Sequence, residues 1–236
     1  MGSDANRIEI ANAAKLAGIA GDSIFLRKLG ITSDLEIGSV RALDFNGLMT
    51  FVAGPSNLNG LTTTANNGNI TLTTQGGDLT ITQGVTAHGS GYVDIRTANT
   101  GNLGDIAINN GATISSTSGT IQVIAGNTVT TDSANSTITE ISTSGQVLLE
   151  AGLRIGTDGH RVELGSVSLL AARTLGNGAG SHLWLRKLGP GSDLEIGSAT
   201  VQNSGSVLDN AVSATGQTIL ANGVATALKG LSTTAN

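Results

Sequence analysis

Three histidines are the residues of this chain best suited to acid–base or metal chemistry, and they lie far apart in the sequence, at His88, His160 and His182. None of them has a carboxylate or a second histidine at the spacing of a metal site. His160 follows Asp158 by two residues and could form an acid–base dyad with it, but Thr-Asp-Gly-His is more typical of a polar turn. The chain has no cysteine, which excludes disulfides and thiolate metal sites. We therefore predict no catalytic residue, no metal site and no cofactor.

A charged motif that occurs twice is the other candidate for a site. Leu-Arg-Lys-Leu-Gly is followed two residues later by Ser-Asp-Leu-Glu-Ile-Gly-Ser, at residues 26–39 and again at residues 185–198. Two cations and two carboxylates then flank a turn, which could bind a partner. The simpler interpretation is a solvated pair of strands with complementary charges, worth about 0–1 kcal/mol per ion pair. The candidates for surface interaction are Arg27, Lys28, Asp34, Glu36, Arg186, Lys187, Asp193 and Glu195.

Two further classes of function remain open. Many parallel β-helices degrade acidic polysaccharides, but they need carboxylates clustered on adjacent coils, and the 17 Asp and Glu residues here are scattered. Ice binding is suggested by Thr-Leu-Thr at 71–73 and Thr-Ile-Thr at 80–82, whose threonines are expected to face outward. The corresponding positions further along the chain, such as Asp94 and Ala107, are not threonine. We therefore predict that the chain is not an enzyme and has no threonine lattice.

The composition predicts a thin core. Glycine occupies 34 of 236 positions, aromatic residues make up 2% and charged residues 12%, so aliphatic side chains must fill the interior. A hydrophobic content of 39% with a net charge of −5 is the reverse of the pattern of disordered chains. The net negative charge disfavours nucleic acid as a partner. No apolar run approaches the roughly 18 residues that span a bilayer, so no membrane insertion is expected.

Short runs of alternating apolar residues, separated by Gly, Asn, Asp or Ser, recur from about residue 67 onward, as at 70–72, 79–81 and 93–95. No convincing amphipathic helix interrupts them, and the aromatic plugs of a β-sandwich are missing. The pattern predicts an all-β protein, a single-stranded right-handed parallel β-helix (β-solenoid) over residues 1–236. With ~20 residues per coil and ~4.8 Å between coils, we expect about eleven coils in a rod roughly 50 Å long.

A long-range repeat divides this solenoid. Besides the two copies of the charged motif, residues 7–10 resemble 161–164 and residues 60–66 resemble 230–236. We assign a first copy to about 7–160 and a partial second copy to about 161–236, and interpret residues 1–3 as a scar of cloning. Solenoids tolerate insertions between such repeats because each coil contacts only its neighbours. We expect a piece of a longer tandem array whose open strand edges promote end-to-end self-association.

The segments Gly-Asn-Ile-Thr-Leu-Thr at 68–73 and Gly-Asp-Leu-Thr-Ile-Thr at 77–82 resemble the repeats of filamentous haemagglutinin-type exoproteins and giant bacterial adhesins. The resemblance implies a stalk at the cell surface or secreted from the cell, exported by an outer-membrane transporter, with export directed by sequence outside this chain. It predicts a structural or adhesive rod whose partner is a cell-surface glycan or protein. The alternative is a carbohydrate-binding or polysaccharide-degrading β-helix.

Overall fold

The computed structural model describes residues 1–3, 5–30, 32–41, 57–97, 104–109, 111–134, 137–176, 180–189, 193–200 and 227–233. These residues form 26 strands and no helix, so the expectation of an all-β protein is confirmed for them. It follows that this part of the chain contains no helix able to cross a membrane.

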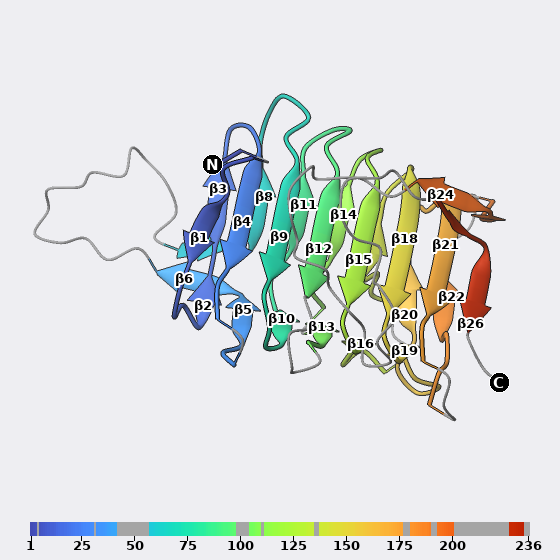
Figure 1. Ribbon diagram of the computed structural model, residues 1–236. Helices are drawn as coiled ribbons and strands as arrows, with labels where there is room; N and C mark the ends of the chain where they lie inside the picture. Colours follow the sequence, from blue (N-terminus) through green and yellow to red (C-terminus); the bar gives the residue numbers. More distant parts are fainter. Residues whose placement is uncertain are drawn as a thin grey trace, which may run out of the picture.

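Most strands pair in parallel in three sheets, here called A, B and C (Figure 1). Sheet A consists of β1 (Ile8–Ile10), β4 (Ile24–Lys28), β9 (Ile70–Thr74), β12 (Val93–Thr97), β15 (Ile121–Ala125), β18 (Gln146–Ala151), β21 (Leu169–Thr174) and β23 (Glu195–Ile196), with β26 (Leu231–Thr233) also on β21. Sheet B consists of β2 (Lys15–Leu16), β5 (Leu35–Ile37), β10 (Leu79–Ile81), β13 (Ile106–Ile108), β16 (Thr128–Thr131) and β19 (Arg154–Ile155). Sheet C consists of β3 (Gly18–Ala20), β8 (Leu61–Thr63), β11 (Val85–Ala87), β14 (Ile114–Ser116), β17 (Ile141–Ser142), β20 (Val162–Leu164) and β22 (Leu185–Lys187).

The chain visits the three sheets in turn, which is consistent with a parallel β-helix. From β9 to β21 it passes from A to B to C and back to A, and strands pair with their counterparts in the next turn of the chain. Two antiparallel hairpins interrupt this order, β6 (Ser39–Arg41) with β7 (Asn57–Asn59) and β24 (Ser198–Thr200) with β25 (Ala227–Lys229).

From β9 to β18, the spacing between successive strands of sheet A is longer than the coil length expected from the sequence. In register, Ile70 pairs with Val93, Val93 with Ile121, and Ile121 with Val147, and every one of these steps exceeds that length. Each turn contains one strand from each of the three sheets and three corners that connect them. The residues of the corners account for the longer turn. The expected eleven coils are not confirmed, because the order of sheet A in the described residues runs through eight strands.

Aliphatic side chains from all three sheets form one core. In sheet A, Leu72, Ile95, Val123 and Leu149 occupy consecutive positions in register, and each is fully buried. The core cluster of the described residues contains Ile, Leu, Val and Ala and no aromatic residue. Burying each Ile, Leu or Val contributes about 1.5–3 kcal/mol. The thin aliphatic core predicted from composition is therefore confirmed.

Glycines form a column at the corner that precedes sheet A. A Cβ atom on Gly91 would lie 2.2 Å from the carbonyl oxygen of Gly68, and one on Gly119 would lie 2.1 Å from that of Gly91. Backbone atoms of adjacent turns therefore meet at a distance that leaves no room for a side chain.

Aspartates connect successive turns at the corner that leads into sheet B. Asp34 Oδ1 accepts a hydrogen bond from the Asp78 N–H at 2.9 Å, and Asp78 Oδ1 accepts one from the Asp105 N–H at 2.9 Å. Asp105 Oδ1 in turn accepts from the N–H and hydroxyl of Thr128. Each carboxylate thus satisfies a backbone donor of the next turn, which N–H groups at corners require. Three of the acidic residues that looked scattered in the sequence, Asp34, Asp78 and Asp105, are therefore aligned in space.

Candidate functional site

The two charged motifs do not form hairpins. Within the first, β4 lies in sheet A and β5 in sheet B, and within the second, β22 lies in sheet C and β23 in sheet A. Charged residues of the motifs form ion pairs with a neighbouring strand in the same sheet: Arg27 with Glu9 at 3.7 Å, Glu36 with Lys15 at 3.0 Å, and Arg186 with Glu163. Across the turn of the first motif, the charge of Asp34 acts on Lys28.

The eight candidate residues differ in exposure. Lys28 is fully buried and its Nζ donates to the Ser33 carbonyl oxygen. Burial lowers the pKa of Lys28, against the opposing effect of Asp34. Lys28 is therefore a structural residue and not a surface one. Asp34, Asp193 and Glu195 are exposed or partly exposed, as are Arg27, Glu36, Arg186 and Lys187.

The long-range repeat is also a repeat in structure. In the first copy, Glu9 of β1 pairs in register with Arg27 of β4, and in the second copy Glu163 of β20 pairs with Arg186 of β22. An ion pair joins the two side chains in both places. The first pair lies in sheet A and the second in sheet C. Equivalent segments of the two copies thus occupy different sheets.

Backbone hydrogen bonds around the two hairpins are likewise repeated. In the first copy three backbone N–H groups donate to carbonyl oxygens in succession. Gly38 donates to Leu16 at 3.1 Å, Gly60 donates to Gly38 at 2.9 Å, and Gly18 donates to Gly60 at 2.8 Å. In the second copy the equivalent bonds are Gly197 to Leu170 at 3.1 Å, Gly230 to Gly197 at 2.8 Å and Ala172 to Gly230 at 2.9 Å. In the first copy Ala17 separates β2 from β3, whereas β21 is continuous in the second. The repeated unit therefore includes the hairpin insertion, and the sheet into which it folds depends on its position in the stack.

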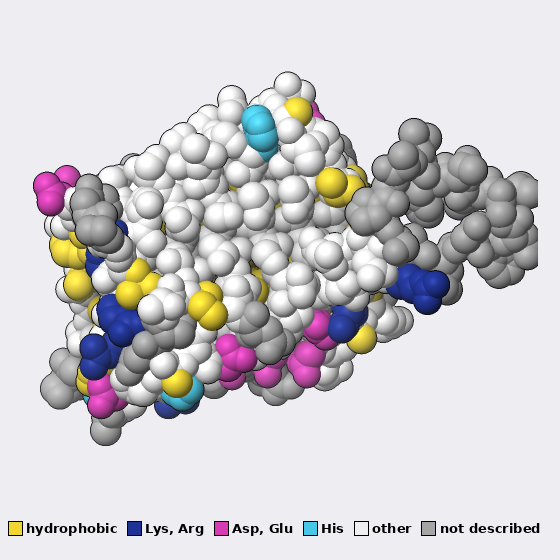
Figure 2. Space-filling view, turned by 180° about the vertical axis from the view of Figure 1, so that it is seen from behind, with side chains coloured by type: hydrophobic (Ala, Val, Ile, Leu, Met, Phe, Trp, Pro, Cys, Tyr) yellow, Lys and Arg dark blue, Asp and Glu magenta, His cyan; other side chains and the backbone are white. Residues whose placement is uncertain are grey.

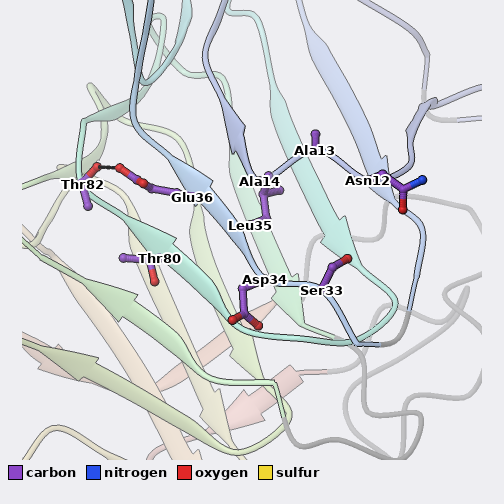
Figure 3. A pocket seen from close by; sticks show the side chains of 9 residues that line it. All are labelled: Asn12, Ala13, Ala14, Ser33, Asp34, Leu35, Glu36, Thr80 and Thr82. Atoms are coloured by element: carbon purple, nitrogen blue, oxygen red, sulfur yellow. Dashed lines mark hydrogen bonds between the residues drawn. The ribbon is translucent and has the colours of Figure 1, made fainter.

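A groove lies on the outer side of sheet B, between residues 12–14 and strands β5 and β10. It has a volume of about 490 Å³ and is lined by Asn12, Ala13, Ala14, Ser33, Asp34, Leu35, Glu36, Thr80 and Thr82. Figure 3 shows the Glu36 side chain directed at Thr82, whose hydroxyl donates to Glu36 Oε1 at 2.7 Å. Two carboxylates and several hydroxyl groups around an apolar floor suit a small hydroxylated ligand. Asp34 and Glu36 are the only two of the eight candidates that line this groove.

The carboxyl group of Glu36 has a lowered pKa, chiefly because of the hydrogen bond from Thr82 and then that from Lys15. A lowered folded-state pKa contributes stability that is present above the unfolded-state pKa and lost as the pH falls through the folded-state pKa. We expect Thr82→Val to raise the pKa of Glu36 towards its ordinary value, measured by carboxyl-resolved NMR titration. Thr80→Val removes another hydroxyl from the same groove and should leave that pKa unchanged. An unaltered Glu36 titration in Thr82→Val would contradict the role given to this hydrogen bond.

Glu140 and Glu163 form a buried acidic pair beside sheet C. Glu140 is 1% exposed and Glu163 is fully buried. Glu140 Oε2 accepts from the Glu163 N–H at 2.7 Å, and Glu140 Oε1 accepts from the Thr131 hydroxyl at 3.2 Å. Burial raises the pKa of Glu140, and the charge of Glu163 raises it further, against the lowering effect of these hydrogen bonds. Burial therefore makes the carboxyl group of Glu140 harder to ionise than an exposed glutamate.

Glu140→Gln should reduce the pH dependence of stability. A raised folded-state pKa contributes stability that is fully present below the unfolded-state pKa and is lost as the pH rises through the folded-state pKa. Glutamine keeps an acceptor for the Glu163 N–H but cannot ionise. Unfolding in denaturant between about pH 4.5 and 7 should show a flatter stability profile for the variant than for the parent. The control is Glu9→Gln, whose parent side chain is 56% exposed, and a profile unchanged in Glu140→Gln would refute the assignment.

The threonines that suggested an ice-binding lattice do not form one. Thr71 and Thr73 are fully buried on sheet A. Asp94, the neighbour of Thr71 in register, is also fully buried, and Asp94 Oδ1 accepts from Arg96 Nε at 2.7 Å and from Gln122 Nε2 at 2.6 Å. The outward positions of sheet A are therefore buried, and the hydrogen-bonded polar residues there lie beside the apolar Ile124 and Leu148. The expected exposure of Thr71 and Thr73 was wrong, because strand alternation shows which residues share a face but not whether that face meets solvent.

A row of hydroxyl groups that the sequence analysis missed crosses sheet C. Thr62, Thr86, Ser115 and Ser142 are consecutive in register, and the Ser115 hydroxyl donates to that of Thr86 at 3.1 Å. Figure 2 shows a face whose middle is nearly free of charged side chains, with acidic residues gathered along one margin. The row was hidden because its members come from separate turns of the chain and only their register reveals them.

The three histidines stay separate. His88 and His182 are exposed and His160 is partly exposed, and no group of three His, Cys, Asp or Glu residues within the described ranges could hold a metal. His182 does join a small aromatic cluster, with its ring centroid 6.3 Å from that of Trp184 in an edge-on arrangement. Arg161 lies over the Trp184 ring at 5.6 Å and pairs with Asp158 at 3.0 Å. Sequence alone could not have joined residues from separate segments.

Parallel strands in three stacked sheets around an aliphatic core define the class of this chain: an all-β protein with a repetitive architecture consistent with a parallel β-helix. No family model, curated protein or solved structure matches the chain.

Proposed function

We propose that this chain is a segment of a right-handed, single-stranded parallel β-helix that serves as a structural and adhesive rod in a large secreted or cell-surface bacterial protein. The observation that supports it most is the continuity of three parallel sheets around one aliphatic core, from β1 to β23. Such a stack is stiff because every turn is joined to its neighbours by backbone hydrogen bonds along the axis. Eight strands in the order of sheet A, at about 4.8 Å per step, give a length of roughly 35 Å.

The resemblance of residues 68–73 and 77–82 to filamentous haemagglutinin-type repeats extends the proposal to the whole protein. In that family such a stalk is exported by an outer-membrane transporter and holds its active tip away from the cell. A cell-surface glycan or protein is the partner that fits this role. The hydroxyl row on sheet C and the groove on sheet B are the described surfaces available for it.

A glycan array, combined with a screen for lyase and hydrolase activity against polysaccharides, tests this function. We expect binding without turnover, and small-angle scattering of the monomer should give the cross-section of a narrow rod. Turnover of any polysaccharide would overturn the structural role in favour of a degrading enzyme.

Carbohydrate binding is the second candidate, and the Trp184 cluster favours it. The Trp184 ring has Arg161 over it, and Arg161 pairs with Asp158, so an aromatic surface lies close to charged groups, a combination common in ligand-binding sites. Trp184 is the single tryptophan of the chain, so its fluorescence reports on this location alone. A glycan that shifts the emission, and whose binding is lost in Trp184→Ala but kept in Glu36→Gln, would assign the site to this cluster rather than to the groove.

A further inference from the structure

Exposed apolar side chains gather at the two ends of the stack. Four of the six large hydrophobic residues that are exposed in the described ranges lie on strands that end a sheet: Ile8 at 42%, Ile19 at 54%, Ile196 at 46% and Leu231 at 47%. The first two belong to β1 and β3, at one end of the stack, and the last belongs to β26, at the other end (Figure 1). Ile196 belongs to β23, which pairs with β21 as β26 does. Each of these strands has an edge with no strand partner among the described residues. Unpaired, apolar strand edges are templates for another chain.

The charges at the two ends are complementary in one arrangement. Strand β1 carries Glu9 between two isoleucines, and β22 carries Arg186 after Leu185. Strand β2 begins with Lys15 and β23 begins with Glu195. If β1 stacks on β22 and β2 on β23, each cation meets a carboxylate. If the second molecule were not rotated about the long axis of the stack, its sheet A would continue sheet A of the first. The two carboxylates Glu9 of β1 and Glu195 of β23 would then face each other.

The internal repeat indicates that the end strands have a suitable shape. Strands β22 and β23 are the second-copy equivalents of β4 and β5, whose corresponding edges pair with β9 and β10. There, aliphatic residues meet in register, such as Leu26 with Leu72 and Ile37 with Ile81. Strands β1 and β2 offer the same alternation, with Ile8 and Leu16 at the inward positions. They can therefore replace β9 and β10 on the second copy.

From these observations we infer that a second copy of this chain docks head to tail, with β1 and β2 of one molecule extending β22 and β23 of the next. The interface is heterologous, so it leaves a free head and a free tail at each step and produces a filament. The inference rests on the proposed rod but does not require it to bind any glycan.

Two end-altered variants test the docking. The head variant carries Ile8→Asp and Leu16→Asp, and the tail variant carries Glu195→Lys and Ile196→Asp. In sedimentation velocity we expect the parent chain to form larger species as its concentration rises and each variant to stay monomeric. An equimolar mixture should form a 1:1 dimer, in which the intact tail of the head variant binds the intact head of the tail variant. This dimer should grow no further, because only the two altered ends remain free. The control Thr86→Lys, an exposed change in the middle of sheet C, should associate like the parent.

A parent chain that stays monomeric at every concentration, or a mixture that forms no dimer, would overturn the inference. Thermal unfolding checks that each variant is folded. Should a double variant fail to fold, the single charge reversal Glu195→Lys supplies the tail test, and a chain with Lys15→Glu should restore its association. Small-angle scattering of the monomer measures the cross-section of the rod independently of association. A negative result for docking is therefore distinguishable from a failure of the proposed function.

Discussion

Replacing Gly119 by alanine is expected to cost about 3 kcal/mol of unfolding free energy, at the upper end for overpacking. The added Cβ would lie 2.1 Å from the Gly91 carbonyl oxygen and 2.7 Å from that of Ser90. Both obstacles are backbone atoms, so no side chain can rotate to make room. The two adjacent turns would have to separate, which would weaken the hydrogen bonds between β12 and β15 on which sheet A depends.

Gly21→Ala is the matched control for this change. A Cβ at Gly21 meets nothing within 4 Å, so the substitution should be neutral or stabilise the fold by up to about 1 kcal/mol through the unfolded state. Urea unfolding of the two variants and the parent, followed by circular dichroism, measures the difference. Equal stabilities for Gly119→Ala and Gly21→Ala would show that the turns are not packed as closely as described.

Ile95→Ala is expected to destabilise the protein by about 2–5 kcal/mol, the range for truncating a buried aliphatic side chain. Ile95 is fully buried between Leu72 and Val123 in register, and the core is too narrow for a large side chain from elsewhere to fill the space. Because each turn contacts only its neighbours, the loss is concentrated at the middle of the stack.

Ile19→Ala provides the comparison, since the parent side chain is 54% exposed and the change should alter stability by no more than about 0.5 kcal/mol. Hydrogen exchange would locate the effect: amides of β9, β12 and β15 should lose protection in Ile95→Ala, while those of β21 retain it. A loss spread evenly along the stack, with β1 and β21 affected as much as β9 and β15, would contradict nearest-neighbour stability.

Strand content, parallel stacking and the aliphatic core were predictable because they depend on local pattern. Alternating residues such as Ile70, Leu72 and Leu79 identify short strands, and the scarcity of aromatic residues predicts a narrow interior. The length of each turn was underestimated, since corners carry no periodic signal and their residues vary in number. The exposure of Lys28 was misjudged for a related reason: its position in an alternating strand does not reveal that its ammonium group reaches the Ser33 carbonyl inside the fold.

The candidate surfaces were less predictable than the fold. The sequence analysis named Asp34 and Glu36 but joined them to Arg27 and Lys28, whereas the groove brings them together with Thr80 and Thr82. The hydroxyl row of sheet C and the Trp184 cluster were not foreseen, because their members come from separate turns. Pairing register is a property of the stack and not of any one segment.

By itself, the sequence determined that the chain forms short strands, that aliphatic residues fill its interior and that one unit occurs twice. Only the tertiary structure decided which sheet each copy occupies: Glu9 and Arg27 pair in sheet A, while their equivalents Glu163 and Arg186 pair in sheet C. The physical reason is that alternation and turn residues act over a few positions, whereas the sheet that a strand joins depends on the summed length of every corner before it.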